Sequence, residues 1–304
     1  MSPSSTSNLM ARAVALKTAI PGFNIPYLPM LEPVALALRD CDAFGLVMVA
    51  RLEWVKFKSE SLEAVAEEYR RFASERHTRL HLDHVPVVDE DDARVDYLDI
   101  VRRAIRAGYE SVMIDGSRLS LRENIACTRE VADLAHTAGI PVEGELGAVL
   151  GHEAGPLPPY EELFRSGKGF TDVEEAAAFA SASGADWLSV AIGNVHGAIS
   201  AVARGKAKVE ARLALERLRQ IRDRIGIPLV LHGGTGMRKQ DLLAAFKLGI
   251  AKINVATAIR QPYEAALAQG AAAAQDAVYA TMLKILRDDL EMEGSAERLA
   301  PTGG

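Results

Sequence analysis

The chain has 304 residues, of which 49% are hydrophobic, and its formal net charge is −6. This length supplies one large core or two small ones, and the negative balance argues against a nucleic-acid-binding protein, which would need concentrated Lys and Arg. The two cysteines, Cys41 and Cys127, exclude a disulfide scaffold and a thiolate zinc site, and they predict a reducing cytoplasm.

Both ends of the chain are expected to be loose. Residues 1–8 are rich in serine, and residues 297–304 end in Pro-Thr-Gly-Gly. The segment Ala11–Ile20 carries Arg12 and Lys17, which excludes both a signal-peptide core and a membrane span. We therefore expect no membrane partner.

Short apolar runs bounded by turn residues alternate with helical patterns through the chain. Such runs are typical of buried parallel strands. Helical spacing is expected over Leu62–Arg76, Ala93–Ala107, Val209–Arg224 and Lys239–Leu248. Eight strands are expected at Phe23–Ile25, Gly45–Ala50, Arg79–His84, Ser111–Asp115, Ile140–Leu146, Trp187–Ile192, Pro228–Leu231 and Ala251–Ala256.

Two helix starts have capping patterns. Ser120 is followed three residues later by Glu123, and Thr171 by Glu174. Between these helices, residues 147–170 form a Gly- and Pro-rich loop that is longer than usual connections. We expect this loop to have a role in the active site.

Eight strand–helix units without a linker predict a single-domain (β/α)8 TIM barrel over residues 1–304. A doubly wound open sheet is the alternative. Polar residues follow the third to the eighth strand, as a shared catalytic face would require, whereas an open sheet concentrates its site at one switch point. The barrel is therefore favoured.

Three histidines, His84, His196 and His232, follow the third, sixth and seventh strands. In a barrel these positions meet at one mouth, and three imidazoles with one open position are a common catalytic zinc site. A structural histidine is the alternative for any one of them. His81 lies three residues before the first of these, and it is expected to be packed in the core or to support a metal ligand.

Three acidic residues lie close to these positions. Asp83 directly precedes His84, and both reach the mouth only if the strand ends there, because neighbours in a strand point to opposite faces. Glu145 is expected to bond loop backbone or arginines. Glu153, in the long loop, suits a proton carrier that closes over substrate, although a solvated charge is the alternative.

A phosphate site is expected after the last two strands. The turn Gly233–Gly236 leaves backbone N–H groups accessible, and Asn254–Thr257 adds a hydroxyl group and further amides. Loops after strands seven and eight often bind phosphate in this barrel.

Taken together, the motifs resemble the class II, metal-dependent ketose-bisphosphate aldolase family, particularly its fructose- and tagatose-bisphosphate branch. They run in family order over most of the chain. The motifs are His81-Leu-Asp-His84, Ser111-Val-Met-Ile-Asp-Gly-Ser117, Val142-Glu-Gly-Glu-Leu-Gly147, Val190-Ala-Ile-Gly-Asn-Val-His-Gly197, Leu229-Val-Leu-His-Gly-Gly-Thr-Gly236 and Lys252-Ile-Asn-Val-Ala-Thr257.

The resemblance implies a role for each of these candidates. His84, His196 and His232 would hold one catalytic Zn²⁺ ion, which polarises the ketone and stabilises the enediolate. Asp83 would exchange a proton with the hydroxyl group at the cleaved bond, and Glu153 would be the mobile acid/base.

The resemblance also implies the substrate contacts. Backbone oxygens near Gly197 and Gly233 match a monovalent cation site, for Na⁺ or K⁺. Arg118, Ala154 and Ser200 depart from the family pattern, and Lys206, Lys208 or Arg260 could replace a missing phosphate-binding lysine. The residues that would grip dihydroxyacetone phosphate are Gly197, Gly233, Thr235, Asn254 and Thr257.

The expected function is reversible retro-aldol cleavage of a phosphorylated ketose to dihydroxyacetone phosphate and an aldehyde, by a cytoplasmic homodimer or homotetramer. One alternative is a diverged, non-catalytic aldolase-like subunit. The other is a metal-dependent barrel isomerase that uses the same enediolate chemistry.

Overall fold

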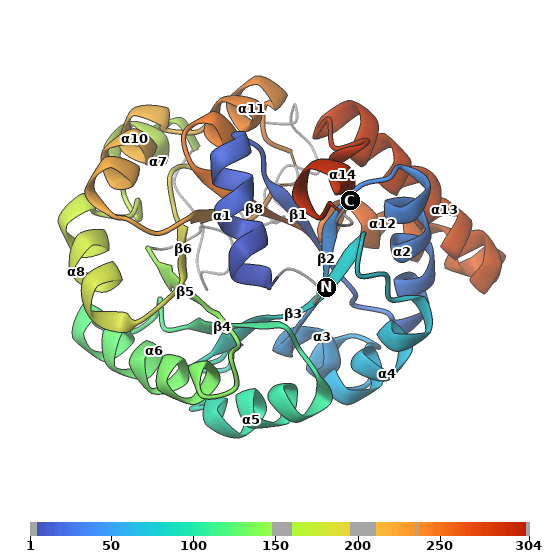
Figure 1. Cartoon of the computed structure of the whole chain (residues 1–304), viewed down its shortest axis with the longest axis horizontal. Helices are drawn as coiled ribbons and strands as arrows, with labels where there is room; N and C mark the ends of the chain where they lie inside the picture. The colour runs from blue at the N-terminus through green and yellow to red at the C-terminus, as the bar shows by residue number, and fades with distance from the viewer. Residues whose placement is uncertain (1–4, 148–159, 195–210, 235, 302–304) are drawn as a thin grey trace.

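The computed structural model describes residues 5–147, 160–194, 211–234 and 236–301. Eight parallel strands close into a barrel in sequence order, because β8 pairs with β1 as well as with β7 (Figure 1). This confirms the predicted (β/α)8 TIM barrel. The strands are β1 (Ile20–Asn24), β2 (Gly45–Ala50), β3 (Thr78–Pro86), β4 (Ser111–Asp115), β5 (Val142–Leu146), β6 (Trp187–Val190), β7 (Leu229–Leu231) and β8 (Ile250–Val255).

The helices surround the barrel (Figure 1). None of those in the described ranges is long and apolar enough to span a membrane. The helices after the strands are α2 (Leu31–Asp40), α3 (Arg51–Lys56), α4 (Leu62–Phe72), α5 (Tyr97–Ala107), α6 (Leu121–His136), α7 (Tyr160–Ser166), α8 (Val173–Ser183), α10 (Leu215–Arg224), α11 (Lys239–Lys247), α12 (Thr257–Ala266) and α13 (Ala271–Lys284). There are also short helical turns: η1 (Leu28–Met30), η2 (Leu267–Gln269) and the π-helical η3 (Ile285–Asp289).

The end of the barrel where the strands begin is closed by α1 (Thr6–Leu16), which crosses the ring of strands, with α14 (Ser295–Leu299) beside it (Figure 1). Leu9 and Met10 of α1 are fully buried in a cluster with Leu46 of β2 and Trp187 of β6. This apolar layer excludes water from the half of the barrel where the strands begin.

Nearer the C-terminal ends of the strands, the barrel interior is polar. The inward side chains of this layer bond one another across the barrel, for example from β8 to β3 and from β7 to β5. The apolar cluster around α1 closes the end of the barrel where the strands begin. A ligand must therefore approach these polar side chains from the end where the strands finish. The buried members of the layer are Asn24, His81, Asp83, Glu143, Glu145, His232, Lys252 and Asn254.

Strand β3 does not end at His84, contrary to the expectation from sequence. It continues to Pro86, and its register against β4 shifts between Leu82 and Val85. His84 adopts a φ of +25°, which is unusual for a residue with a side chain. A bulge of this kind places two successive residues on one face of a strand. Asp83 and His84 therefore both face the mouth.

Several boundaries differ from the expected ones. The ends are more ordered than expected, because α1 begins at Thr6, which is 2% exposed, and Leu299 of α14 is fully buried. The loop of residues 147–170 contains α7. Asp172, not Thr171, caps α8, and its carboxylate accepts from the backbone N–H groups of residues 174 and 175.

Candidate metal centre and active site

Three of the predicted site residues lie together at the mouth of the barrel. Asp83 and His84 are on β3, and His232 directly follows β7. One ligand atom from each lies within 4.8 Å of one from each of the others. The two imidazole rings meet edge to face, with their centroids 4.6 Å apart. The spacing suits a single ion for the two described imidazoles, whereas the predicted third, that of His196, stays a prediction.

Four of the predicted residues fall outside the described ranges: His196, Gly197, Glu153 and Thr235. Their roles remain predictions. The part of the site that is described therefore comprises residues of β1, β3, β4, β5 and β8 and the residues directly after β7.

His84 is surrounded by carboxylates. Its Nδ1 atom lies 3.2 Å from Asp115 Oδ2 and 3.7 Å from Glu145 Oε2. Burial alone would lower the His84 pKa, but the negative charges of Asp83 and Glu145 and the hydrogen bond with Asp115 raise it to about 10. The same negative surroundings that hold a proton on the ring would attract a divalent cation in its place.

His232 is held by two glutamates of β5. Its Nε2 atom lies 2.8 Å from Glu143 Oε1, and its Nδ1 atom lies 3.2 Å from Glu145 Oε2. Glu145 was expected to bond loop backbone or arginines, but its carboxylate instead lies between the two candidate ligands. Burial and the charge of Asp115 raise the pKa of Glu145.

The donor set fits a divalent metal. Metal-binding histidines usually donate their second ring N–H to a carboxylate, which fixes the tautomer. If Asp115 accepts from Nδ1 of His84, the Nε2 atom is left for a metal, and if Glu143 accepts from Nε2 of His232, the Nδ1 atom is left. Imidazole nitrogens with nearby carboxylates are ligands that zinc accepts.

Asp83 is held between two amides. Its Oδ2 atom accepts from Asn24 Nδ2 and its Oδ1 atom accepts from Asn254 Nδ2, both at 2.9 Å. Burial alone would raise the pKa of Asp83, but the positive charges of His84 and Lys252 outweigh it and hold the pKa well below its usual value. Asp83 is therefore an oriented, ionised carboxylate.

Beneath the candidate ligands lies an ion pair between β5 and β8. Lys252 Nζ donates to Glu143 Oε2 at 2.8 Å, and Trp187 Nε1 donates to the same oxygen at 2.7 Å. All three side chains are at most 1% exposed. Burial opposes ionisation of Glu143, but the charge of Lys252 and the hydrogen bond of His232 lower its pKa. This pair therefore keeps Glu143 ionised where it bonds His232.

Lys252→Met should destabilise the barrel by about 3–5 kcal/mol, because it leaves the charge of Glu143 buried without its cation. Urea unfolding of the metal-free protein measures this. The double variant Lys252→Met/Glu143→Gln should recover part of the loss, because it removes the unpaired charge. A loss below about 1 kcal/mol in the single variant would show that the pair does not hold this layer together.

The predicted phosphate segment is only partly described. Gly233 has a φ of +70°, and a Cβ on Gly234 would lie 2.8 Å from side-chain atoms of Ile253, so this turn requires glycine. Thr257 is the first residue of α12, and the first backbone N–H groups of a helix have no partner within the helix. Asn254, predicted to grip the phosphate, donates its amide to Asp83.

Arg260 lies one turn into α12. Its guanidinium bonds both oxygens of Glu264, at 2.7 and 2.8 Å, and stacks over the ring of Phe57 at 5.3 Å. It is thus preorganised at the same end of the barrel as Thr257, but it already has a carboxylate partner.

Sequence reasoning did not assign a site role to Asn24, Glu143, Asp115 or Lys252. Their contacts become visible only when the strands are placed side by side. One signal was present in the sequence: Lys252 is the one charged residue of the strand β8, and charged residues are rarely buried unless they are paired.

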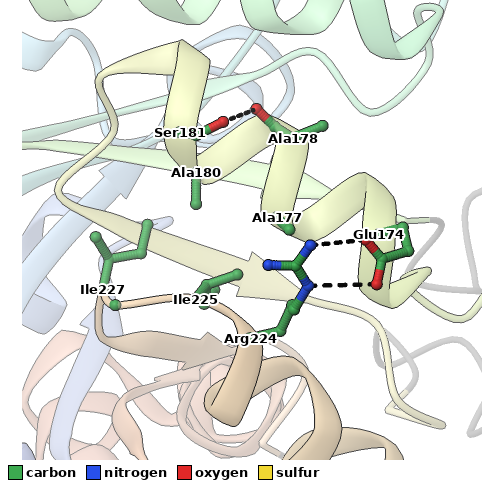
Figure 2. Close-up of a pocket in the computed structure, with 9 residues that line it drawn as sticks. Glu174, Ala177, Ala178, Ala180, Ser181, Arg224, Ile225 and Ile227 are labelled. Carbon is green, nitrogen blue, oxygen red and sulfur yellow. Dashed lines mark hydrogen bonds and ion pairs between the residues drawn. The ribbon is translucent and has the colours of Figure 1, made fainter.

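A separate cavity of about 470 Å³ lies on the outside of the barrel, between α8 and the end of α10 (Figure 2). It is lined mainly by alanines and isoleucines, and Arg224 and Glu174 form an ion pair at 3.0 Å across it. None of the candidate site residues lines it. The chemistry is therefore expected at the mouth of the barrel.

The chain matches the family model for fructose-bisphosphate aldolase class-II over residues 4–298. The YdjI aldolase of Escherichia coli K12 is 26% identical, with a TM-score of 0.75 over 97% of this chain and 100% of that one. A putative fructose-1,6-bisphosphate aldolase of Coccidioides immitis is also 26% identical, with a TM-score of 0.74 over 96% and 98%. The fructose-bisphosphate aldolase of Campylobacter jejuni shares the fold at 17% identity, with a TM-score of 0.70 over 96% of each chain.

Proposed function

The chain belongs to the class II fructose-bisphosphate aldolase family, and we propose that it cleaves a phosphorylated ketose to dihydroxyacetone phosphate and an aldehyde. Its membership of this family makes it a metal-dependent carbon–carbon lyase that acts on a sugar phosphate. The observation that carries this proposal is the group formed by Asp83, His84 and His232 at the mouth of the barrel. It combines an ionised carboxylate with two oriented imidazoles.

We assign the role of base to Asp83. Held by Asn24 and Asn254, its carboxylate accepts the proton of the substrate hydroxyl group at the bond being cleaved, and the aldehyde then departs. Glu153, in the loop after β5, supplies a proton to the carbon left behind. In the synthetic direction the same two groups exchange protons in the reverse order.

The proposed metal is zinc, held by His84, His232 and His196. A bound zinc ion would act as a Lewis acid on the ketone carbonyl. With the metal bound, Glu143 and Asp115 would each accept the remaining ring N–H of one described imidazole, which would leave the other ring nitrogen for the ion. Glu145 contributes negative charge to the same place.

The phosphate of the three-carbon fragment is proposed to bind the segments after β7 and β8. Gly197, Gly233 and Thr235 offer backbone groups, and Thr257 lies at the start of α12. Asn254, which lies beside Asp83, is proposed to bind the phosphate as well. Arg260 is a further cation at the mouth of the barrel. A monovalent cation, Na⁺ or K⁺, would bind backbone oxygens near Gly197 and Gly233.

We also propose that the enzyme is a cytoplasmic homodimer or homotetramer. Both cysteines, Cys41 and Cys127, are buried free thiols, which suits a reducing compartment. Light scattering coupled to gel filtration measures the number of subunits.

A screen of phosphorylated ketoses tests the proposed reaction. Dihydroxyacetone phosphate is measured with a coupled dehydrogenase, and the aldehyde is measured separately. We expect both products in equal amounts from at least one ketose phosphate, with loss of turnover after chelation and recovery with zinc. Turnover that survives complete metal removal, or release of an isomerised sugar without an aldehyde, would contradict the proposal.

A further inference from the structure

Glu53 is a buried carboxyl group that the proposed reaction does not use. It is the third residue of α3, which begins directly after β2, and it is 7% exposed. Its Oε2 atom accepts a hydrogen bond from the backbone N–H of Ala50 at 2.8 Å. Because this bond closes the first turn of α3, the carboxyl group is fixed relative to the end of β2.

The amide of Asn24 connects Glu53 to Asp83. Asn24 Nδ2 lies 2.9 Å from Asp83 Oδ2 and 3.4 Å from Glu53 Oε2, and its two N–H groups can donate one to each carboxyl group. The terminal torsion of asparagine is broad, so an amide with one anchor can turn, whereas an amide with two is held. Glu53 thus restricts the orientation of the Asn24 amide, and this amide restricts the orientation of the Asp83 carboxylate.

The two carboxyl groups differ in charge. Burial, together with the negative charge of Asp83, raises the pKa of Glu53 to about 8. From β3 the titratable groups that act on it are Asp83 and His84, and β1 presents the neutral amide of Asn24. At neutral pH, Glu53 is therefore a neutral carboxyl group beside an ionised one.

The cations of α3 are engaged elsewhere. Arg51 Nη1 lies 3.2 Å from Asp89 Oδ2, and Lys56 Nζ lies 3.5 Å from Asp91 Oδ2, both in the loop after β3. Neither forms an ion pair with Glu53 in the described structure. The neutral form of Glu53 is thus favoured by its surroundings on α3 as well.

We propose that Glu53 is a positioning residue for the reaction, which holds the amide of Asn24 so that the carboxylate of Asp83 points at the substrate hydroxyl group. This role depends on the proposed function, because it presupposes that Asp83 is the base. It also requires that Glu53 be neutral, since a second negative charge would repel Asp83 and disturb the shared amide.

Two variants separate positioning from simple packing. Glu53→Gln keeps a neutral side chain with an acceptor oxygen, and its kcat at pH 7 should stay within about twofold of the wild type. Glu53→Leu removes the anchor, and its kcat should fall on the order of tenfold to a hundredfold, with KM and bound metal little changed. Rates are expressed per metal-loaded, folded site, so that loss of stability alone does not count.

The pH profile provides a second readout. Raising the pH through about 8 ionises Glu53, so wild-type kcat should fall on that limb, whereas the kcat of Glu53→Gln should not. An alkaline fall shared by both proteins, or a wild-type kcat in Glu53→Leu, would overturn the positioning role. If Asp83→Ala is inactive while Glu53→Leu is unaffected, this role alone fails. A wild type without aldolase activity would overturn the proposed function itself.

Discussion

His232→Ala is expected to purify without the divalent metal and to cleave no sugar phosphate at a measurable rate. The imidazole is fixed through Nε2 by Glu143, and it lies edge to face with His84, so its removal deletes one nitrogen from the group that would hold the ion. Loss of a mere supporting residue costs about 10–100-fold in metal affinity, and loss of a ligand should cost more. Metal content by mass spectrometry and the dihydroxyacetone phosphate assay give the two readouts.

His136→Ala is the matched control. His136 ends α6 on the outside of the barrel, where its Nε2 atom lies 2.8 Å from Asp186 Oδ2. This variant should keep both metal and activity. If His232→Ala retains a full complement of metal, the proposed site is in the wrong place.

Asp83→Ala is expected to bind metal normally and to lose activity by a factor on the order of 10²–10⁴, which is the usual range for a general acid–base group. The structure leaves two roles open on distance alone, because Asp83 lies as close to the two histidines as a ligand would. Its two amide bonds favour the base, since they orient both oxygens through Asn24 and Asn254.

Metal content decides between these two roles. A base can be removed without loss of the ion, whereas a ligand cannot. Equal metal loss in Asp83→Ala and His232→Ala would therefore make Asp83 a ligand and leave the reaction without an assigned base.

Much of the fold could be predicted from short-range patterns. The strands are continuous apolar runs because both faces of a barrel sheet are buried, and the predicted run Gly45–Ala50 coincides with β2. The capping box at Ser120 is present, with its hydroxyl group accepting from Glu123 and the carboxylate of Glu123 reaching back. Both signals depend on neighbours in sequence, so one chain suffices to detect them.

Boundaries set by tertiary contacts could not be predicted. Thr171 resembled a helix cap, but its hydroxyl group donates to the carbonyl of Leu146 and accepts from the N–H of Ala191, joining the ends of two strands. Asp172 caps the helix in its place. The sequence pattern could not decide between Thr171 and Asp172 as the cap, because each has a side-chain oxygen close to the start of the helix.

The candidate metal ligands could be predicted from the sequence, but the residues that hydrogen-bond and orient the site residues could not. His84 lies near the end of β3 and His232 directly follows β7, and the positions of the apolar runs in the sequence are enough to reveal this. The bond from Asn24 to Asp83 joins β1 to a strand that it does not pair with, across the interior of the barrel. Such contacts depend on the stagger of the closed sheet, and periodicity in one sequence carries no information about that stagger.

The register shift of β3 sets fold stability against activity. Asp83 and His84 both face the mouth only because the strand carries an irregular residue with a φ of +25°. Deleting Asp83 would restore a regular ladder between Leu82 and Val85 and relieve this backbone strain, and His84 would then take the inward position that Asp83 holds. Selection for thermal tolerance alone would favour that deletion, and it would produce a sturdier barrel without the carboxylate that we propose as the base.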